Sequence, residues 1–150
     1  MSNAKQERLI SYYRNITEHL RHVLNVQRER CLKSGQDVHD QQMDLDFYVI
    51  IVRRVFELFK MGKSVSRLET TELTDYFKNR WPHLTDHRNS VLHIIAPSPG
   101  EDIPQYIGGQ FIATFRAGGE LKYIIDPRHH HEEVIGLLDK FAGIIDEHRR

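Results

Sequence analysis

The sequence predicts a mainly α-helical fold, a bundle of about five helices with one β-hairpin inserted before the last helix. Three observations lead to this prediction. Apolar residues recur at the three- and four-residue spacing of a helix along most of the chain. Prolines interrupt that spacing at residues 97 and 99, and two β-rich runs separated by a glycine pair follow them. We find no internal repeat or linker in the 150 residues, so residues 5–150 are expected to form a single domain.

The composition indicates a soluble globular protein. Hydrophobic residues make up 39% and charged residues 28% of the chain, a balance found in folded domains rather than in disordered ones. Because the formal net charge is +0 at pH 7, binding to RNA or DNA would need a local basic patch. No stretch approaches the ~18 apolar residues of a membrane-spanning helix, so we expect no membrane contact.

The start of the chain and its cysteine usage carry further information. Residues Met1–Ala4 are typical of an expression-tag remnant and are left out of the predicted domain. Cys31 is the single cysteine, so the chain can form neither an intrachain disulfide nor a cysteine metal site. A lone thiol is typical of a reducing compartment, which predicts a cytoplasmic protein.

Two long helices are expected first. The first spans residues 5–33 and turns one apolar face toward the core, formed by Leu9, Tyr13, Ile16, Leu20, Val23 and Leu24. The second spans His39–Met61, before Gly62. It is apolar nearly all round, which indicates a central helix or one buried in a subunit interface. Asp44 and Asp46 are interpreted as carboxylates that the helix dipole favours near the helix start.

A third, shorter helix is expected next. Ser66 and Glu69 fit a capping box, in which a serine caps the helix and a glutamate three residues later reaches back. The helix is expected to end near Arg80, because the following Trp81-Pro82 cannot continue it.

The C-terminal part is expected to contain a hairpin and a last helix. The runs Gln110–Arg116 and Glu120–Ile125 are rich in β-forming residues, and the glycine pair between them suits a tight turn. Asp126-Pro127 is a favourable helix start, with a capping carboxylate followed by a proline at the first position. The last helix is expected to bury Val134, Leu137, Leu138, Phe141 and Ile145.

Three arginines form a second stripe on the first helix. Arg14, Arg21 and Arg28 are seven residues apart and lie away from its apolar face. One interpretation is a solvated helix face. The other is a patch that binds RNA by following the phosphates of its backbone.

Three consecutive histidines, His129–His131, suggest a metal site. Neighbouring residues of a helix point about 100° apart, so three in a row cannot hold one ion. We interpret these histidines as a solvated first turn of the last helix, and we expect no metal and no cofactor.

Arg88 is the residue that most needs a functional explanation. A short helix is expected over residues 86–96, capped at its start and ended by Pro97. Because an unpaired buried charge is very costly, Arg88 needs a partner side chain, a ligand or a second subunit. The apolar stripe within which Arg88 falls consists of Leu84, Val91, Leu92 and Ile95.

Arg88 and Asn89, followed by His93, resemble the signature of the HEPN domains, a nucleotide-binding family of higher eukaryotes and prokaryotes. In that signature an arginine, often followed by an asparagine, stands a short distance before a histidine. The helical bundle and the position of the motif on a late helix agree with the family. Many members are metal-independent endoribonucleases, often toxins or phage-defence effectors, whereas others only bind nucleotides, RNA or proteins.

The resemblance implies roles that suit the chemistry of these side chains. RNA carries its own nucleophile, the 2′-hydroxyl, so cleavage needs a general acid or base and a cation. His93 would transfer the proton, since histidine titrates at about pH 6.5. Arg88 would stabilise the pentavalent phosphate, and Asn89 would orient the histidine or a phosphate oxygen.

The same motif predicts a homodimer. Five helical positions separate Arg88 from His93, which places them about 140° apart around the helix axis. One chain therefore makes a poor site, whereas two chains related by a two-fold axis could bring both residues of each chain into one cleft. The apolar second helix and the hairpin are candidate interface elements.

Two further features bear on the resemblance. Arg14-Asn15 and His19 fit the same pattern. We favour the later match because it precedes a proline-rich loop, and because Arg14 lies off the core face of its helix.

Some family members carry a tyrosine two residues after the histidine, which a partner nucleotidyltransferase modifies. Ile95 stands there, so such a partner is not expected.

These observations predict a cytoplasmic, homodimeric HEPN-type endoribonuclease, related to toxin or defence systems, with a protein partner such as an antitoxin. The alternative is a HEPN-like module that binds a nucleotide, RNA or protein without catalysis. A third hypothesis, a helical DNA-binding regulator that uses the arginines of the first helix, lacks helix-turn-helix spacing to support it.

Overall fold

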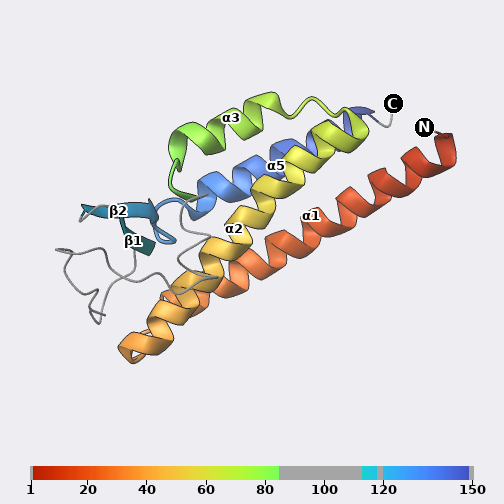
Figure 1. Ribbon diagram of the computed structural model, residues 1–150. Coiled ribbons are helices and arrows are strands. Elements are labelled where there is room, and N and C mark those ends of the chain that lie inside the picture. Colours follow the sequence, from red (N-terminus) through yellow and green to blue (C-terminus); the bar gives the residue numbers. More distant parts are fainter. Residues whose placement is uncertain (1, 85–112, 118–119, 149–150) are drawn as a thin grey trace.

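The computed structural model describes residues 2–84, 113–117 and 120–148, and its described part is mainly helical, as predicted (Figure 1). The helix expected over residues 86–96 lies outside the described residues. The described elements are the helices α1 (Asn3–Cys31), α2 (Val38–Ser66), α3 (Thr71–Arg80) and α5 (His131–His148), and the strands β1 (Ala113–Ala117) and β2 (Glu120–Ile125).

Helix α2 is the central element of the bundle. It contacts α1, α3, α5 and β1, whereas α1 packs on α2 and α5 (Figure 1). Helices α1 and α2 are the two longest elements and run side by side in opposite directions. The sequence left open whether the nearly all-apolar second helix is central or buried in an interface, and these contacts show that it is central within the chain.

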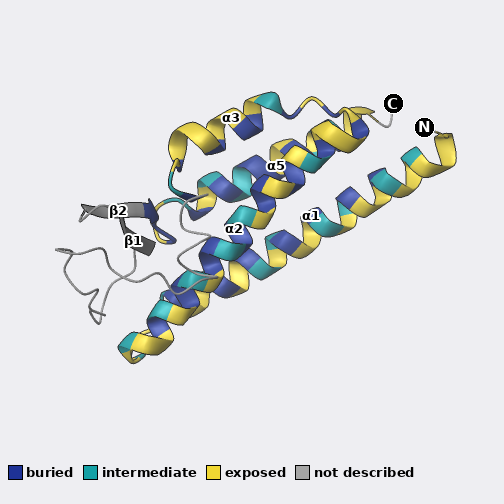
Figure 2. Ribbon diagram, in the orientation of Figure 1, coloured by how far each residue is buried: buried dark blue, intermediate teal, exposed yellow. Residues whose placement is uncertain are grey.

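The core lies between α1, α2 and α5 (Figure 2). Aromatic rings pack against one another in the middle of this core. The ring of Phe141 on α5 lies with its centroid 5.1 Å from that of Phe59 and 6.1 Å from that of Tyr13. All three side chains are completely buried. Rings of this size remove large apolar areas from water, so they contribute strongly to the stability of the bundle.

Helix α2 continues beyond its expected end. Gly62 was expected to close it near Met61, but the helix runs to Ser66 and ends at Arg67, which adopts the left-handed conformation with φ 54°. A Cβ atom at Gly62 would lie 3.1 Å from Cε2 of Phe141. Glycine at this position therefore permits close packing between α2 and α5 instead of ending the helix.

The predicted capping box is wrong. Ser66 belongs to the last turn of α2, and its hydroxyl lies 2.7 Å from the hydroxyl of Tyr13 on α1. The N-cap of α3 is Thr70, whose hydroxyl donates to the backbone oxygen of Phe59 at 2.8 Å. The hydroxyls of Ser66 and Thr70 therefore bond to other helices or segments instead of capping α3. The predicted end of α3 at Arg80 is confirmed.

The strands and the last helix join through a tight turn. Strands β1 and β2 pair antiparallel, with Ala117 opposite Glu120. Helix α5 begins at His131 rather than at Asp126-Pro127 as predicted. The reason is that the Asp126 carboxylate accepts the backbone N–H of Arg128 at 2.9 Å, which closes a turn. No described helix combines the length and the apolar character that crossing a membrane requires.

Candidate functional site

The three residues of the favoured motif lie outside the described residues: Arg88, Asn89 and His93. The structure does describe the residues that lead into this segment. Trp81 and Leu84 are buried, with 2% and 3% of their surface exposed. The ring of Trp81 packs on Phe77 of α3 with centroids 5.1 Å apart. The chain is therefore anchored in the core of the bundle immediately before the motif.

The second match to the motif has a different arrangement. Nη2 of Arg14 donates to the carboxylate of Asp146 on α5 at 2.7 Å. Asn15 and His19 are exposed on α1. Because Arg14 and His19 are five positions apart on one helix, their side chains point about 140° apart. Arg14 is thus engaged with α5, and α1 does not bring the arginine and the histidine together.

The arginine stripe of α1 lies along α5 and stays partly exposed to solvent, with 42% of the Arg14 side chain and 30% of the Arg21 side chain accessible. Arg14 pairs with Asp146, and Nη2 of Arg21 lies 2.6 Å from the carboxylate of Asp139. Asp139 and Asp146 are seven residues apart, as the arginines are, so an antiparallel packing of the two helices brings each pair together. RNA binding by this stripe stays a prediction, and RNA would compete with these carboxylates.

Arg28, the third arginine of the stripe, holds the turn before α5. Its Nε donates to the backbone oxygen of Pro127 at 3.0 Å, and its Nη2 donates to the backbone oxygen of Arg128 at 3.4 Å. These carbonyls belong to residues of the turn that precedes the helix. Arg28 therefore fixes the position of this turn on α1.

A hydrogen-bond network joins three helices at the start of α5, and it is buried at Tyr48 and His131 and exposed at Asn25. Nδ1 of His131 lies 2.9 Å from the hydroxyl of Tyr48 on α2. Nε2 of His131 lies 2.8 Å from Oδ1 of Asn25 on α1. Because the Asn25 oxygen can only accept, Nε2 of His131 carries the proton and Nδ1 accepts from Tyr48. We call Asn25, Tyr48 and His131 the junction network.

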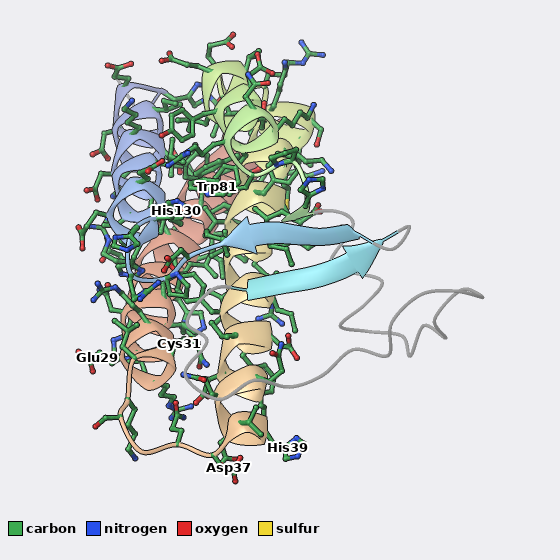
Figure 3. The ribbon with its side chains drawn as sticks, turned by 90° about the vertical axis from the view of Figure 1, so that its left-hand side faces the viewer. Glu29, Cys31, Asp37, His39, Trp81 and His130 are labelled. Carbon is green, nitrogen blue, oxygen red and sulfur yellow. The ribbon has the colours of Figure 1, made fainter. Side chains whose placement is uncertain are left out.

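His130 lies next to this network but has other partners. Its Nδ1 accepts the backbone N–H of Asp126 at 3.0 Å and the indole N–H of Trp81 at 3.4 Å. Figure 3 shows His130 and Trp81 close together above the strands. The contact connects the end of α3 to the start of α5. His130 therefore links the residues that precede the motif segment to the last helix.

The two histidines are held in their neutral forms. Burial, followed by the nearby guanidinium of Arg28, lowers the pKa of His131. Burial, followed by the positive charge of Arg80, lowers the pKa of His130. Burial also raises the pKa of the Tyr48 hydroxyl, so it stays a donor at neutral pH. The junction network is thus uncharged, with every ring nitrogen of His131 satisfied.

The prediction of a solvated histidine turn is therefore wrong for His131, which is 2% exposed, and holds for His129, whose side chain is 72% exposed. His129 and His130 precede α5, and His131 is its first residue. The three side chains diverge into different surroundings. Among the residues that the structure describes, no group of three side chains suited to bind a metal ion lies together.

Asp44, which the sequence suggested is a charge at a helix start, also takes part in buried hydrogen bonds. It is buried, with 7% of its surface exposed. Its carboxylate accepts the side-chain amide of Gln36 at 2.6 Å and that of Gln27 at 3.2 Å. The Cys31 thiol donates to the Asp44 backbone oxygen at 3.3 Å. Burial, followed by the Asp44 charge, raises the pKa of that thiol to about 12, so it is not a nucleophile.

Two hollows lined by described residues do not suit a nucleotide. A hollow of ≈ 450 Å³ lies beside the loop that joins α1 to α2. Its lining carries three carboxylates, of Asp37, Asp40 and Asp44, against the single ammonium group of Lys33, so its net charge would repel a phosphate. A hollow of ≈ 100 Å³, lined in part by Trp81 and Leu84, is smaller than the about 300–1,000 Å³ of ordinary ligand pockets.

Sequence reasoning missed the junction network and the role of Asp44. A signal for His131 was present, because it stands three and seven residues before Val134 and Leu138, on the apolar face of α5. A signal for the arginine stripe was present in the matching spacing of Asp139 and Asp146. No sequence pattern pointed to Asn25 or Gln36, since their partners lie on other segments.

Comparison with protein-family models, with curated proteins and with solved structures found no match.

Proposed function

We propose that the protein is a cytoplasmic, metal-independent endoribonuclease of HEPN type, related to toxin or defence systems. Arg88 and His93 act in a cleft between two copies of the chain, and Asn89 supports them. A fifth helix over residues 86–96 carries these residues and belongs to the proposal. The motif itself is the observation that carries it.

The described bundle supports the choice between the two motif matches. Arg14 is engaged by Asp146, 2.7 Å away, in a helix–helix contact that accounts for its presence. The buried anchors Trp81 and Leu84 also fix where the chain enters the motif segment. The proposal therefore concerns Arg88 and His93 rather than Arg14 and His19.

The proposed reaction is an attack of the RNA 2′-hydroxyl on the adjacent phosphorus. A bond forms between the 2′-oxygen and phosphorus, and the bond from phosphorus to the 5′-oxygen breaks. One His93 takes the proton of the 2′-hydroxyl, and the His93 of the second copy gives a proton to the leaving oxygen. Arg88 binds the phosphate oxygens as negative charge develops on them. The products are a 2′,3′-cyclic phosphate and a 5′-hydroxyl.

The three arginines of α1 enter the proposal as groups that bind RNA phosphates. Their guanidinium groups are shared with Asp139, Asp146 and turn carbonyls, so we expect each to add little affinity. Arg21→Ala removes one phosphate-binding group and should lower the salt dependence of RNA affinity by about one unit of slope. An unchanged slope would remove Arg21 from the RNA-binding surface.

Cleavage of mixed RNA in the presence of EDTA tests the proposal. Arg88→Ala and His93→Ala should each abolish cleavage while leaving the helical circular-dichroism signal unchanged. The matched control is His19→Ala, which alters the other motif match and should cleave like the wild type. New ends should carry cyclic phosphate. Full activity of Arg88→Ala would overturn the proposal, as would cleavage that disappears in EDTA.

The second candidate function is a non-catalytic module that binds a nucleotide, RNA or a protein. One observation favours it: Arg14 and Arg21 of the basic stripe are paired with carboxylates inside the chain, which reduces the positive charge offered to RNA. This candidate predicts binding that survives His93→Ala, together with no cleavage at any pH. Cleavage that depends on His93 would exclude it.

A further inference from the structure

Helix α2 leaves one face uncovered by the other described elements. Although α2 is central in the bundle, Met43 and Phe47 on this face are 50% and 49% exposed. Ile50 follows with partial exposure, and Asp40 and Arg54 are exposed at either end. We call Asp40, Met43, Phe47, Ile50 and Arg54 the α2 stripe.

The spacing of the α2 stripe is that of a helix–helix seam. Its positions alternate in steps of three, four, three and four residues. This alternation keeps side chains on one line along a helix and is the pattern through which two helices pack along their length. An exposed methionine and phenylalanine at the centre of such a line are suited to burial against another helix.

The charges of the stripe are arranged symmetrically. Asp40 stands seven residues before Phe47, and Arg54 stands seven residues after it. Each charge is therefore about 10.5 Å along the helix axis from Phe47, in opposite directions. Within the part of the chain that the structure describes, the side chains of Asp40 and Arg54 have no ion-pair partner. Both can therefore pair with another molecule.

We propose that the α2 stripe binds a second copy of this chain, with the two α2 helices antiparallel and Phe47 at the two-fold axis. In this arrangement each Asp40 meets Arg54 of the second copy, so both ends of the seam carry an ion pair. A parallel arrangement would place like charges opposite each other, which is unfavourable. The self-complementary charge pattern selects a second copy as the occupant.

This inference deepens the proposed function, because it names the surface of the dimer on which the proposed function rests. The two can fail separately. The interface is tested by molecular mass in solution, which needs no enzymatic activity. A dimer that does not cleave RNA would overturn the ribonuclease proposal and leave the interface intact. A monomer that cleaves RNA would overturn both the interface and the need for a two-chain cleft.

Charge reversal tests the pairing of Asp40 with Arg54. Sedimentation velocity over a range of protein concentrations should give a dimer for the wild type. Asp40→Arg and Arg54→Asp should each weaken it by about tenfold or more, because each change places two pairs of like charges in the interface. The variant with both changes should recover the dimer. So should an equimolar mixture of the two single variants, in which every facing pair is opposite in charge.

The mixture also separates the proposal from a folding defect, since misfolded chains would not associate when mixed. Phe47→Glu should give a monomer, whereas the matched control Tyr12→Glu on α1, where the tyrosine is 50% exposed, should stay dimeric. A wild-type monomer at all concentrations would overturn the proposal. The proposal would also be overturned if the dimer persisted unchanged in Phe47→Glu or in the single charge-reversal variants.

Discussion

The hydroxyl of Tyr48 lies 2.9 Å from Nδ1 of His131, in a contact that ties the central helix α2 to the first residue of α5. Both residues are buried, and Asn25 of α1 satisfies the other ring nitrogen of the histidine. Three helices thus share one uncharged network. The buried pair of Tyr48 and His131 favours this arrangement of α2 and α5, because separating the two would leave buried polar groups unsatisfied.

Removing the Tyr48 hydroxyl should destabilise the protein. Tyr48→Phe keeps the ring and leaves Nδ1 of His131 buried without a donor, so the free energy of unfolding should fall by about 1–3 kcal/mol. Urea denaturation followed by circular dichroism measures this change. The exposed Tyr12 provides the control, since Tyr12→Phe should stay within about 0.5 kcal/mol of the wild type. Equal stability of the two variants would show that the network contributes nothing.

The stability of the protein should decrease in acid through His131. Its pKa in the folded protein is below the ordinary value of 6.5, so below pH 6.5 the unfolded chain binds the proton more readily than the folded chain. The free energy of unfolding is therefore highest above pH 6.5 and falls as the pH is lowered. His130 adds to the effect, because its pKa is lowered too.

Denaturation at several pH values tests this dependence. His131→Gln should make the decrease in stability below pH 6.5 shallower, because the group that takes up the proton on unfolding is gone. His19→Gln, a change of an exposed histidine on α1, is the control and should keep the wild-type slope. A slope that His131→Gln leaves unchanged would assign the acid sensitivity to other groups.

Two helical glycines should respond differently to alanine. At Gly136 in α5 a new Cβ would meet no atom within 4 Å, so Gly136→Ala should gain up to about 1 kcal/mol of stability from helix propensity. At Gly62 a Cβ would lie 3.1 Å from Cε2 of Phe141. Gly62→Ala should therefore be less stable than Gly136→Ala. Thermal denaturation compares them, and an equal gain at both sites would contradict close packing at Gly62.

The pairing of α1 with α5 can be tested by exchanging charges. Arg21→Asp and Asp139→Arg should each lower stability, and the combined variant should recover most of the loss. Because both side chains are partly exposed, with 30% and 54% of their surfaces accessible, the coupling should stay below about 1 kcal/mol. It should also shrink at high salt concentration. Additive effects of the two changes would show that the residues do not interact.

Features with a strong local signal could be predicted from the sequence. The mainly helical class follows from apolar spacing, and the buried positions Leu20, Leu24 and Phe141 follow from the same pattern. The end of α3 at Arg80 follows from Trp81-Pro82, because proline cannot donate the hydrogen bond that would continue the helix. The motif of Arg88 and His93 is a sequence observation, and its function stays a proposal.

Features that depend on contacts between distant residues needed the tertiary structure. The sequence assigned Gly62 to a helix end, Ser66 to a cap and His131 to solvent. In the folded chain Gly62 lies against Phe141, Ser66 bonds to Tyr13, and His131 is buried. Local preferences are worth about 1 kcal/mol or less per residue, so burial and tertiary hydrogen bonds override them.

Local sequence accounts for the helices of this chain, for their apolar faces and for the proline that ends α3, because these properties depend on neighbours within a few residues. The choice of polar groups that are buried together, and of the helices that the charged residues join, depends on how the helices pack. Asp139 meets Arg21, and Tyr48 meets His131, because the helices pack in one particular register. That register results from the shape of the whole core, to which many distant residues contribute at once.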